Sequence, residues 1–386
     1  MRVVVIGGGV IGLSCAYELA NRGHAVTLLE KDQFGRKASW AGAGILIPAN
    51  GETAIHPLEH MDALSHVLHQ QWSTRLMEQT GIDNGFRKCG GLYLARTVGE
   101  SASITGLTSE WQARKIKFHE LSQNDIAERF SPFAKTLTDT NSVSKAIWVP
   151  GEAQISNPKH IEALVAACQK LGVNLQQEIG EVQLNVKGLQ IESVSTVDKK
   201  HSGEEFVADK FIVACGPWSE SCLAPLNFPL PMQPVRGQVA MYKLDPVESV
   251  TIVSGPIVNE GSRYLVPRLD GHVLAGATIE EVGFNSATTE TGIASLKAWA
   301  ESLTTHLNEA NFVKAWAGLR PGTYDGFPYI GRLSNQSNAY VATGHFKSGL
   351  HLSTATAVLM SELIEEIEPQ INLQPFSPSR VGSPDQ

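Results

Sequence analysis

A glycine-rich turn near the start of the chain has the residues and the spacing to hold a phosphate-bearing ligand. It reads GGGVIG from Gly7 to Gly12 and matches the pattern GxGxxG. In such a turn Gly7 permits the tight bend, Gly9 lets the backbone approach a pyrophosphate, and Gly12 lets a helix pack close to a strand. The free amides and the dipole at the helix start then hold the phosphate charge.

One carboxylate follows the turn at the distance that nucleotide recognition requires. Glu30 closes the apolar run 25–29, about twenty residues after the turn. A carboxylate there accepts hydrogen bonds from both hydroxyls of an adenosine ribose and repels a 2′-phosphate. These residues favour a dinucleotide and leave NAD and FAD both open. The alternative is a glycine-rich turn of an ordinary α/β protein.

The elements around the turn have the order that the motif needs. Residues 3–6 are β-branched and predict a buried strand. Ile11, Cys15 and Leu19 recur at helical spacing. Residues 25–29 predict a second strand, so the turn lies between a strand and a helix within a βαβ unit.

A single arginine stands out near the other end of the chain. Residues 316–331 read WAGLRPGTYDGFPYIG, and Arg320 is the only cation among these apolar, small and aromatic residues. Burying an arginine without a partner costs free energy. Arg320 therefore either bonds loop carbonyls in a structural role or meets a ligand.

Composition limits the classes of partner. The chain has 386 residues, 42% of them apolar and 18% charged, with a formal net charge of −8 and no block of lysine and arginine. A nucleic-acid partner is therefore not expected. No apolar run approaches the roughly 20 residues of a membrane span, and no amphipathic basic anchor is present, so a stable membrane anchor is not expected either.

The cysteines indicate a reducing compartment. The five are odd in number and contain no CxxC pair, which disfavours both disulfides and a zinc site, and no metal site is predicted. The glycines that interrupt the apolar start of the chain argue against a signal peptide. A cytoplasmic location is expected.

Further elements predict an α/β protein with two domains. Helices are expected at 60–80, 110–118, 291–307 and 349–366, and another that Asn157 caps; strands are expected at 90–96, 173–175, 189–197, 205–208, 211–215, 237–242, 262–267, 272–275 and 340–342. The α/β segments 1–85, 150–222 and 318–386 would form one discontinuous Rossmann-type domain. Segments 86–149 and 223–317 would form a second, α+β domain on an antiparallel sheet that binds the substrate.

Several stretches together resemble the FAD-dependent D-amino acid oxidase family. They are VVVIGGGVIGLSCAYELA, ASWAGAGIL, VACGPWSE, PVRGQV, RYLVPR, LAGAT, WAGLRPGTYDGFPYIG and VATGHFKSGLHLSTATA. They follow the family's order and span nearly the whole chain. The sequence is most similar to the glycine oxidases of thiamine biosynthesis. The resemblance implies FAD as the cofactor, bound non-covalently because no cysteine lies near Arg320 or Lys347 in the sequence.

The resemblance also assigns the substrate-binding residues. It places Arg320 where the family binds the substrate carboxylate, with the hydroxyl of Tyr264 on the same carboxylate. Ile45 and Ile279 stand where the glycine oxidases tend to have methionine, and Lys347 stands where they tend to have arginine. These departures concern the choice of substrate more than the reaction.

Cofactor contacts are implied along the whole chain. The start of the last helix is expected at the pyrimidine edge of the flavin, where Lys347 would favour negative charge. His345 is expected to pack near the ring without transferring a proton. The implied contacts are Gly7, Gly9, Val10, Ile11, Gly12, Glu30, Lys31, Ser39, Ala41, Gly42, Val173, Ala214, Gly216, Trp218, Gly318, Arg320, His345, Lys347, Ser348, Gly349 and Leu350.

The implied activity is the oxidative deamination of glycine or small D-amino acids, with molecular oxygen as the acceptor. The products would be the 2-oxo acid, ammonia and hydrogen peroxide, and no catalytic acid or base is assigned. A D-amino acid dehydrogenase with another acceptor, an oxidase of sarcosine or other N-alkylglycines, and a non-catalytic FAD-stabilised binding protein are the alternatives. A homo-oligomer is expected. The preferred side chain stays open.

Overall fold

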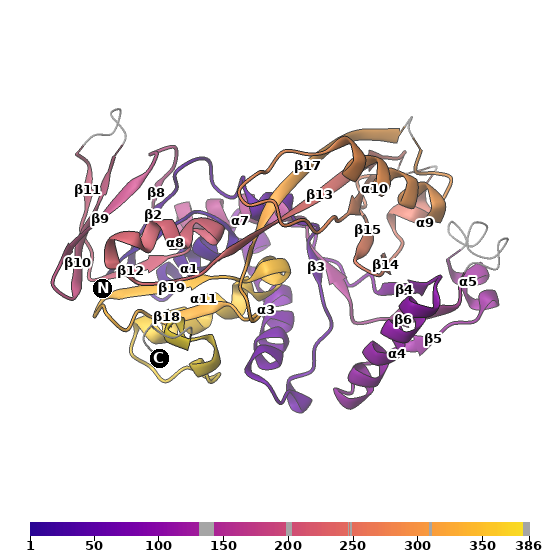
Figure 1. The fold of residues 1–386 in the computed structure, drawn as a ribbon, viewed down its shortest axis with the longest axis horizontal. Helices are drawn as coiled ribbons and strands as arrows, with labels where there is room; N and C mark the ends of the chain where they lie inside the picture. Colours follow the sequence, from indigo (N-terminus) through magenta and orange to yellow (C-terminus); the bar gives the residue numbers. More distant parts are fainter. Residues whose placement is uncertain (131–142, 198–202, 246, 248, 309–310, 381–386) are drawn as a thin grey trace.

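Two large sheets lie side by side in the computed structural model (Figure 1). The structure describes residues 1–130, 143–197, 203–245, 247, 249–308 and 311–380. A six-stranded sheet lies on the left of Figure 1, on the same side as the N-terminus, and an eight-stranded sheet lies on the right. This confirms the mixed α/β class. The domain limits remain a prediction.

The six-stranded sheet combines strands from distant parts of the chain. Its order is β18-β19-β12-β1-β2-β8, parallel except for β18. The bounds are β1 Arg2–Ile6, β2 Ala25–Leu29, β8 Asn174–Gln176, β12 Lys210–Val213, β18 Tyr329–Arg332 and β19 Ala339–Thr343. The first two strands and the α/β order around the glycine turn are confirmed.

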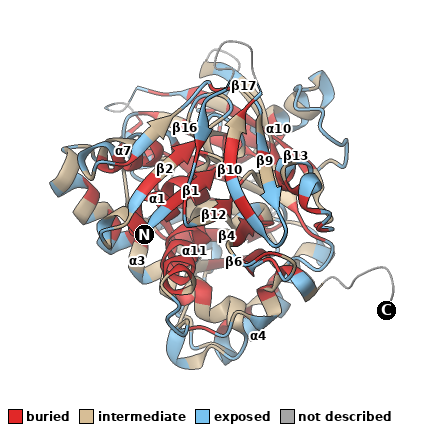
Figure 2. Cartoon of the chain, turned by 90° about the vertical axis from the view of Figure 1, so that its left-hand side faces the viewer, coloured by how far each residue is buried: buried red, intermediate tan, exposed pale blue. Residues whose placement is uncertain are grey.

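Both faces of this sheet are covered at its centre, which is why β1, β12 and β19 are mostly apolar. Val3 and Val5 face a layer of helices, while Val4 and Ile6 belong to the core on the opposite side. The helices are α1 Val10–Asn21, α3 Pro57–Thr80, α7 Asn157–Lys170 and α11 Gly349–Ile364; the other cover is α8 Ser219–Leu223 with a small sheet of β9 Val182–Lys187, β10 Gln190–Thr196 and β11 Glu205–Phe206. Figure 2 shows the buried residues of β1 and α11 at the centre.

The eight-stranded sheet has the order β17-β13-β16-β15-β14-β4-β6-β5. Its bounds are β4 Gly91–Ala95, β5 His119–Glu120, β6 Lys145–Val149, β13 Gln233–Lys243, β14 Ile257–Glu260, β15 Arg263–Pro267, β16 His272–Gly276 and β17 Phe312–Gly322. The expected antiparallel sheet is in fact mixed, because β14 pairs in parallel with β4. Helix α10 Glu290–Leu303 packs against one face of this sheet, and the other face is turned toward the first sheet.

Short elements connect these layers. They are α2 Ala38–Ala41, β3 Ile45–Leu46, η1 Gly51–Thr53, α4 Val98–Ala113, α5 Gln123–Arg129, β7 Ala153–Gln154, η2 Gly216–Trp218, η3 Ala224–Leu226, α9 Val250–Val253, η5 Phe346–Ser348, η6 Gln374–Phe376 and η7 Pro378–Arg380. Strands β13 and β17 are the longest of the sheet and reach from it toward α2 and the end of β12 (Figure 1).

Three local expectations were wrong. The helix expected over 110–118 begins at Val98, where Thr97 and Glu100 form a capping box. The apolar periodicity of this helix is too weak to show its start. The cap of α7 is Ser156, whereas the amide of Asn157 donates to the carbonyl of Ser39. Strand β9 was missed, and it pairs with the whole of β10.

Within the described part of the chain, no helix has both the length and the apolar character to cross a membrane. The five cysteines are free. No cluster of candidate metal ligands occurs among the described residues.

Two buried histidines lie between α3, α7 and α11. The Nε2 of His69 donates to the carbonyls of Leu350 and His351 at 3.0 and 2.8 Å, and His160 lies 3.3 Å from the amide of Asn84. Burial lowers the pKa of His69 well below its usual value and that of His160 to about 4. Both side chains are neutral at pH 7.

Acid should therefore destabilise the fold through His160. The unfolded chain binds this proton near pH 6.5 and the folded chain near pH 4, so the free energy of unfolding should fall as pH drops through that window. The expected loss between pH 7 and 5 is about 2 kcal/mol from this residue. Urea unfolding at both values measures it. His160→Gln should remove about that much of the pH dependence, and an unchanged dependence would contradict the assignment.

Candidate active site

A cavity of about 980 Å³ lies between the two sheets. The carboxyl ends of β1, β12 and β19 line it on one side, and the face of the eight-stranded sheet lines it on the other. Crevices at the carboxyl ends of parallel strands are the usual ligand sites of such sheets. The expected site residues that line it are Gly7, Gly9, Val10, Ile11, Glu30, Lys31, Ser39, Ala41, Gly42, Ile45, Ala214, Gly216, Trp218, Tyr264, Ile279, Gly318, Arg320, His345, Lys347, Ser348, Gly349 and Leu350.

Two of the expected residues do not line the cavity. A Cβ on Gly12 would meet the carbonyl oxygen of Gly7 at 1.9 Å, so this glycine permits the close approach of α1 to the turn. Val173 is buried in the core beside the helix layer, just before β8. Its expected contact with the cofactor remains a prediction without support from its position.

The glycine turn forms a cradle that side chains would fill. Gly7 has φ +105°, and a Cβ there would meet the carbonyl of Ala214 at 2.5 Å. A Cβ on Gly9 would meet Oγ of Ser39 at 3.2 Å. Helix α1 starts directly after Gly9, and the amide of Val10 donates to Ser39 at 2.8 Å. Backbone amides and a helix dipole thus converge on this end of the cavity, as a pyrophosphate requires.

Glu30 is held in place at the end of β2. Its two oxygens accept from the amides of Gly8 and Asp32 at 2.7 and 2.9 Å. Burial raises the pKa of this carboxyl, and the two amides partly offset that effect. The carboxylate is therefore oriented by the backbone, with a lone pair left on each oxygen for a ribose hydroxyl.

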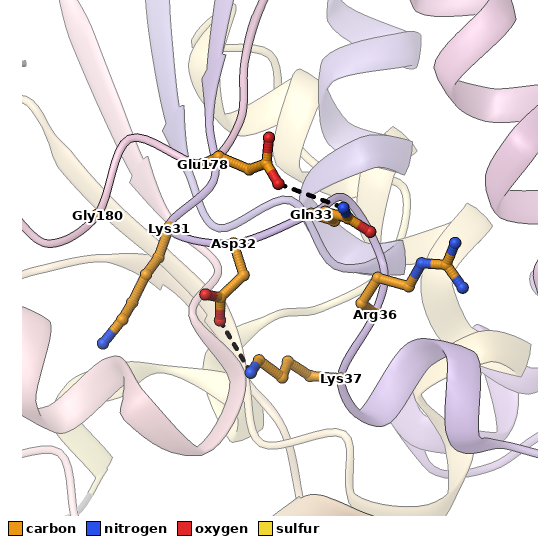
Figure 3. A pocket seen from close by; sticks show the side chains of 7 residues that line it. All are labelled: Lys31, Asp32, Gln33, Arg36, Lys37, Glu178 and Gly180. Atoms are coloured by element: carbon orange, nitrogen blue, oxygen red, sulfur yellow. Dashed lines mark hydrogen bonds and ion pairs between the residues drawn. The ribbon is translucent and has the colours of Figure 1, made fainter. Parts of the chain in front are cut away.

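A polar surface hollow adjoins the Glu30 end of the cavity (Figure 3). Lys37 pairs with Asp32 at 2.8 Å, and the amide of Gln33 donates to Glu178 at 3.2 Å. Lys31, Asp32, Gln33 and Gly180 line both spaces. The hollow is thus the open, solvated edge of the nucleotide end of the cavity.

The small-residue loop after β2 is fixed to the second sheet. The indole nitrogen of Trp316 donates to the carbonyl of Ala41 at 3.1 Å, and Arg268 donates to the carbonyl of Ala43 at 2.7 Å. A Cβ on Gly318 would meet the Cβ of Ala41 at 2.5 Å. The lack of side chains at this contact lets β17 approach the loop.

Arg320 projects from β17 across a neighbouring glycine. A Cβ on Gly237, in the adjacent strand β13, would meet the guanidinium at 2.1 Å. Nη1 donates to the carbonyls of Arg236 and Thr278 at 3.3 and 3.0 Å. Burial lowers the pKa of Arg320, and the interaction with Tyr264 partly offsets the effect. No carboxylate neutralises Arg320 in the part of the chain that the structure describes.

Tyr264 reaches Arg320 across a second glycine. Gly276 pairs with Tyr264 in the neighbouring strand, and a Cβ there would meet the tyrosine hydroxyl at 2.7 Å. The two groups interact electrostatically, and this interaction raises the pKa of Arg320 and lowers that of Tyr264 against the larger effect of burial. Residues far apart in the sequence therefore meet at one end of the cavity, as the resemblance implied.

The loop after β16 is anchored by a different arginine. Arg236 is 3% exposed and bonds Glu280 at 2.5 Å and the carbonyl of Ala287 at 2.8 Å. Both groups lie on the loop that carries Ile279 to the cavity. Ile45 lines the cavity from β3 and packs in the same apolar cluster as Tyr264.

The start of α11 brings one cation and one neutral histidine to the cavity. Lys347 is exposed, and partial desolvation together with the charge of Arg320 lowers its pKa. His345 is buried with Nε2 3.0 Å from the hydroxyl of Thr356, and burial lowers its pKa to about 3. His345 is therefore uncharged at neutral pH.

Sequence reasoning missed a second polar group on the cavity wall. Tyr93, Glu152 and Asn259 all line it, and Glu152 is fully buried. Alternation along β14 puts Asn259 on the same face as Ile257, which could have indicated an inward position. Nothing in the local sequence of Glu152 shows that its carboxyl turns into the sheet.

The fold and the cavity define a dinucleotide-binding α/β protein whose second sheet closes the ligand site. Residues 2–363 match the model of the DAO family, described as FAD dependent oxidoreductase, and the chain belongs to this family. It is 34% identical to a glycine oxidase of Pseudomonas aeruginosa over 98% of both chains. A crystal structure of glycine oxidase from Geobacillus kaustophilus is similar with a TM-score of 0.87 at 29% identity, covering 98% of this chain and 99% of that one. A D-amino acid dehydrogenase of Methylobacterium nodulans is 25% identical over 98% of this chain and 99% of its own length.

FAD is the cofactor of this family, and the residues present fit it. The glycine cradle and the start of α1 suit the pyrophosphate, and Glu30 suits the ribose hydroxyls. The small residues of the 38–44 loop leave backbone surface for a flat ring system. The resemblance to FAD-dependent D-amino acid oxidases is thus confirmed at the level of family and cofactor.

Glu30→Ala should weaken FAD retention. The ribose hydroxyls would lose a charge-assisted acceptor, worth roughly 1.5–3 kcal/mol, or about 10- to 150-fold in the dissociation constant. Fluorescence titration of the apoprotein with FAD measures the change. Glu178→Gln is the matched control, because Glu178 lines only the adjoining hollow. Equal affinities for the Glu30 and Glu178 variants would refute the ribose contact.

Proposed function

We propose that the protein oxidatively deaminates glycine or a small D-amino acid to the 2-oxo acid and ammonia, with hydrogen peroxide as the second product. The observation that carries this proposal is Arg320, a half-buried arginine that lines the cavity and has no carboxylate partner among the described residues. A small zwitterion supplies the missing carboxylate. Arginine suits it because its planar donors pair with a carboxylate bidentately.

The binding end of the cavity is preorganised for that carboxylate. A carbonyl of β13 and one of the loop after β16 hold one edge of Arg320, and the hydroxyl of Tyr264 supplies a second donor. The substrate therefore enters a site whose donors are already aligned, which favours one orientation of its Cα–H bond. When bound, FAD accepts the hydride and passes the electrons on.

No residue is assigned as an acid or base in the reaction. His345 is neutral at physiological pH because it is buried, so it supplies no charge. Lys347 supplies positive charge at the start of α11, where the helix dipole has the same sign. The protein then contributes to catalysis by positioning the substrate and by favouring negative charge beside the start of α11.

The electron acceptor and the amine substituent separate this proposal from its alternatives. Peroxide release across glycine, sarcosine and D-amino acids tests all of them at once. Turnover with dyes and no peroxide would indicate a dehydrogenase, and a preference for sarcosine would indicate an N-alkylglycine oxidase. Flavin binding without any turnover would indicate a binding protein. The homo-oligomeric state and the cytoplasmic location remain predictions from the sequence.

Arg320→Ala should raise KM for the amino acid substrate and leave the bound flavin in place. Loss of a bidentate partner should cost roughly 1.5–3 kcal/mol, or about 10- to 150-fold in KM. The dissociation constants of benzoate and glycolate, followed through the flavin absorbance, should rise in parallel. The KM of Arg320→Lys should lie between the values of the wild type and of Arg320→Ala, because lysine keeps the charge and loses the planar pair of donors.

Arg332→Ala serves as the control, because Arg332 is exposed on β18 and outside the cavity. A normal KM and normal inhibitor binding in Arg320→Ala would mean that Arg320 only supports the backbone carbonyls of Arg236 and Thr278.

Lys347→Met should change the flavin chemistry more than substrate binding. An ammonium beside the cofactor favours negative charge there, so its loss should slow flavin reduction or reoxidation and weaken sulfite binding to the oxidised flavin. Stopped-flow absorbance measures the rates. Carboxylate inhibitor affinity should change little, and Lys347→Arg should be mild. Loss of inhibitor binding with unchanged sulfite affinity would instead place Lys347 in the substrate site.

A further inference from the structure

A polar network lies on the face of the second sheet that is turned away from the cavity. Arg236 and Gln238 alternate with Gly237 along β13, so their side chains point to the opposite face from Gly237. Gly237 lines the cavity, whereas the side chain of Gln238 bonds the amide and the hydroxyl of Thr289 at the start of α10. The guanidinium of Arg320 lies over Gly237, so the network lies behind it, on the other side of the strand.

Glu280 is the centre of this network. Its Oε2 accepts from Arg236 at 2.5 Å, and its Oε1 accepts from Gln238 at 2.7 Å and from the hydroxyl of Thr278 at 2.5 Å. Burial raises the pKa of this carboxyl, but the hydrogen bonds from the three side chains outweigh that effect and lower the pKa to about 2. Glu280 is therefore a charged acceptor with three donors at neutral pH. We call Glu280, Arg236, Gln238 and Thr278 the Glu280 network.

The backbone of β13 and that of the segment after β16 are joined at the same place. Arg236 and Glu280 exchange two amide-to-carbonyl hydrogen bonds, at 2.8 and 3.0 Å. The amide of Gln238 donates to the hydroxyl of Thr278 at 2.9 Å. The carboxylate of Glu280 thus adds side-chain bonds to an existing backbone bridge and fixes the relative position of the two segments.

Two carbonyls of the Glu280 network hold Arg320. Its Nη1 donates to the carbonyl of Arg236 at 3.3 Å and to that of Thr278 at 3.0 Å. Both carbonyls accept from the same nitrogen, so neither occupies Nη2. The side chains of Arg236 and Thr278 bond Glu280, and their carbonyls bond Arg320. One carboxylate therefore fixes the two acceptors that set the orientation of the guanidinium.

The two arginines differ in their partners. Arg236 is 3% exposed and pairs with Glu280, whereas Arg320 lines the cavity without a carboxylate beside it in the described part of the chain. Loss of the charge on Glu280 would leave a buried, unpaired cation at Arg236, which the surrounding backbone would accommodate by moving. The carbonyls that hold Arg320 would move with it, and a bidentate contact depends on close alignment of its donors.

We propose that Glu280 is a positioning residue for the substrate carboxylate, which acts through the carbonyls of Arg236 and Thr278 to fix the guanidinium of Arg320. The inference rests on the proposed function, because Arg320 must bind the carboxylate for its orientation to matter. Glu280 itself does not line the cavity. The competing role is structural: the network would only tie the loop after β16 to β13 and to α10.

The test measures the binding of glycolate to the holoenzyme through the flavin absorbance. Glycolate is a short carboxylate, so its affinity reports the carboxylate end of the cavity. Glu280→Gln keeps the shape of the side chain and removes its charge. The dissociation constant for glycolate should rise at least about threefold, near the lower limit of coupling within one hydrogen-bond network. A smaller rise overturns the inference.

A double-mutant cycle shows whether Glu280 acts through Arg320. In the Arg320→Ala background, Glu280→Gln should change the dissociation constant for glycolate by less than about 1.5-fold, because the group that it positions is gone. A change as large as that in the wild-type background would mean that the two residues act independently, and would overturn the inference.

Glu281→Gln is the matched control. It removes the same charge from the next residue, which is exposed and lies outside both the cavity and the Glu280 network, so glycolate affinity should equal that of the wild type. The affinity for FAD is the second readout, and Glu280→Gln should bind FAD as the wild type does. A parallel loss of FAD and glycolate affinity would show a general loosening of the cavity and assign Glu280 to the structural role.

Thr278→Val decides the question if Glu280→Gln does not fold. Valine keeps the shape of threonine and removes the hydroxyl that donates to Glu280, so glycolate should again bind at least about threefold more weakly. Unchanged binding in this variant overturns the inference.

Failure of the proposed function gives a different result. If Arg320→Ala binds glycolate as tightly as the wild type, Arg320 is not the carboxylate partner, and the inference falls with the proposed function. If Arg320→Ala weakens glycolate binding while Glu280→Gln does not, the proposed function stands and only the positioning role of Glu280 is refuted.

Discussion

The site depends on one constraint, the burial of the Arg320 guanidinium without a carboxylate beside it in the described part of the chain. Such a charge is costly unless its donors are satisfied. The carbonyls of Arg236 in β13 and of Thr278 after β16 accept from one nitrogen of the guanidinium, Tyr264 interacts with it electrostatically, and the side chain still lines the cavity. Under the proposed function a substrate carboxylate would complete the set, so the cation that is costly to bury would also be the one that selects the ligand.

Space for this arrangement comes from glycines on neighbouring strands. Gly237 admits the guanidinium, and Gly276 admits the ring of Tyr264. At the other end of the cavity, Gly7 lets the turn pass the carbonyl of Ala214, and Gly318 lets β17 approach the loop after β2. The two sheets contact each other through backbone and small residues. The larger side chains, such as Arg320 and Tyr264, line the other end of the cavity.

Local signals in the sequence were sufficient for much of this fold. The β-branched strands, the glycine turn and the apolar helices α1 and α11 are short-range patterns, and the structure confirms them. The start of α4 was missed because its apolar pattern is weak. Strand β9 was missed although Val182, Leu184 and Val186 alternate with polar residues. The parallel pairing of β14 with β4 joins segments some 160 residues apart, and no local pattern encodes it.

The sequence by itself determined a dinucleotide-binding turn, because glycines at this spacing between a strand and a helix have few physical uses, and the resemblance carried by stretches along the whole chain determined the family and FAD as the cofactor. Only the tertiary structure decided which side chains meet. It joined Arg320 to Tyr264, kept Val173 out of the cavity, and turned Glu152 inward to Tyr93 and Asn259. The reason is that strand register and the absence of a Cβ at Gly91, Gly237 and Gly276 direct these side chains, and register is a property of paired strands, not of any one segment.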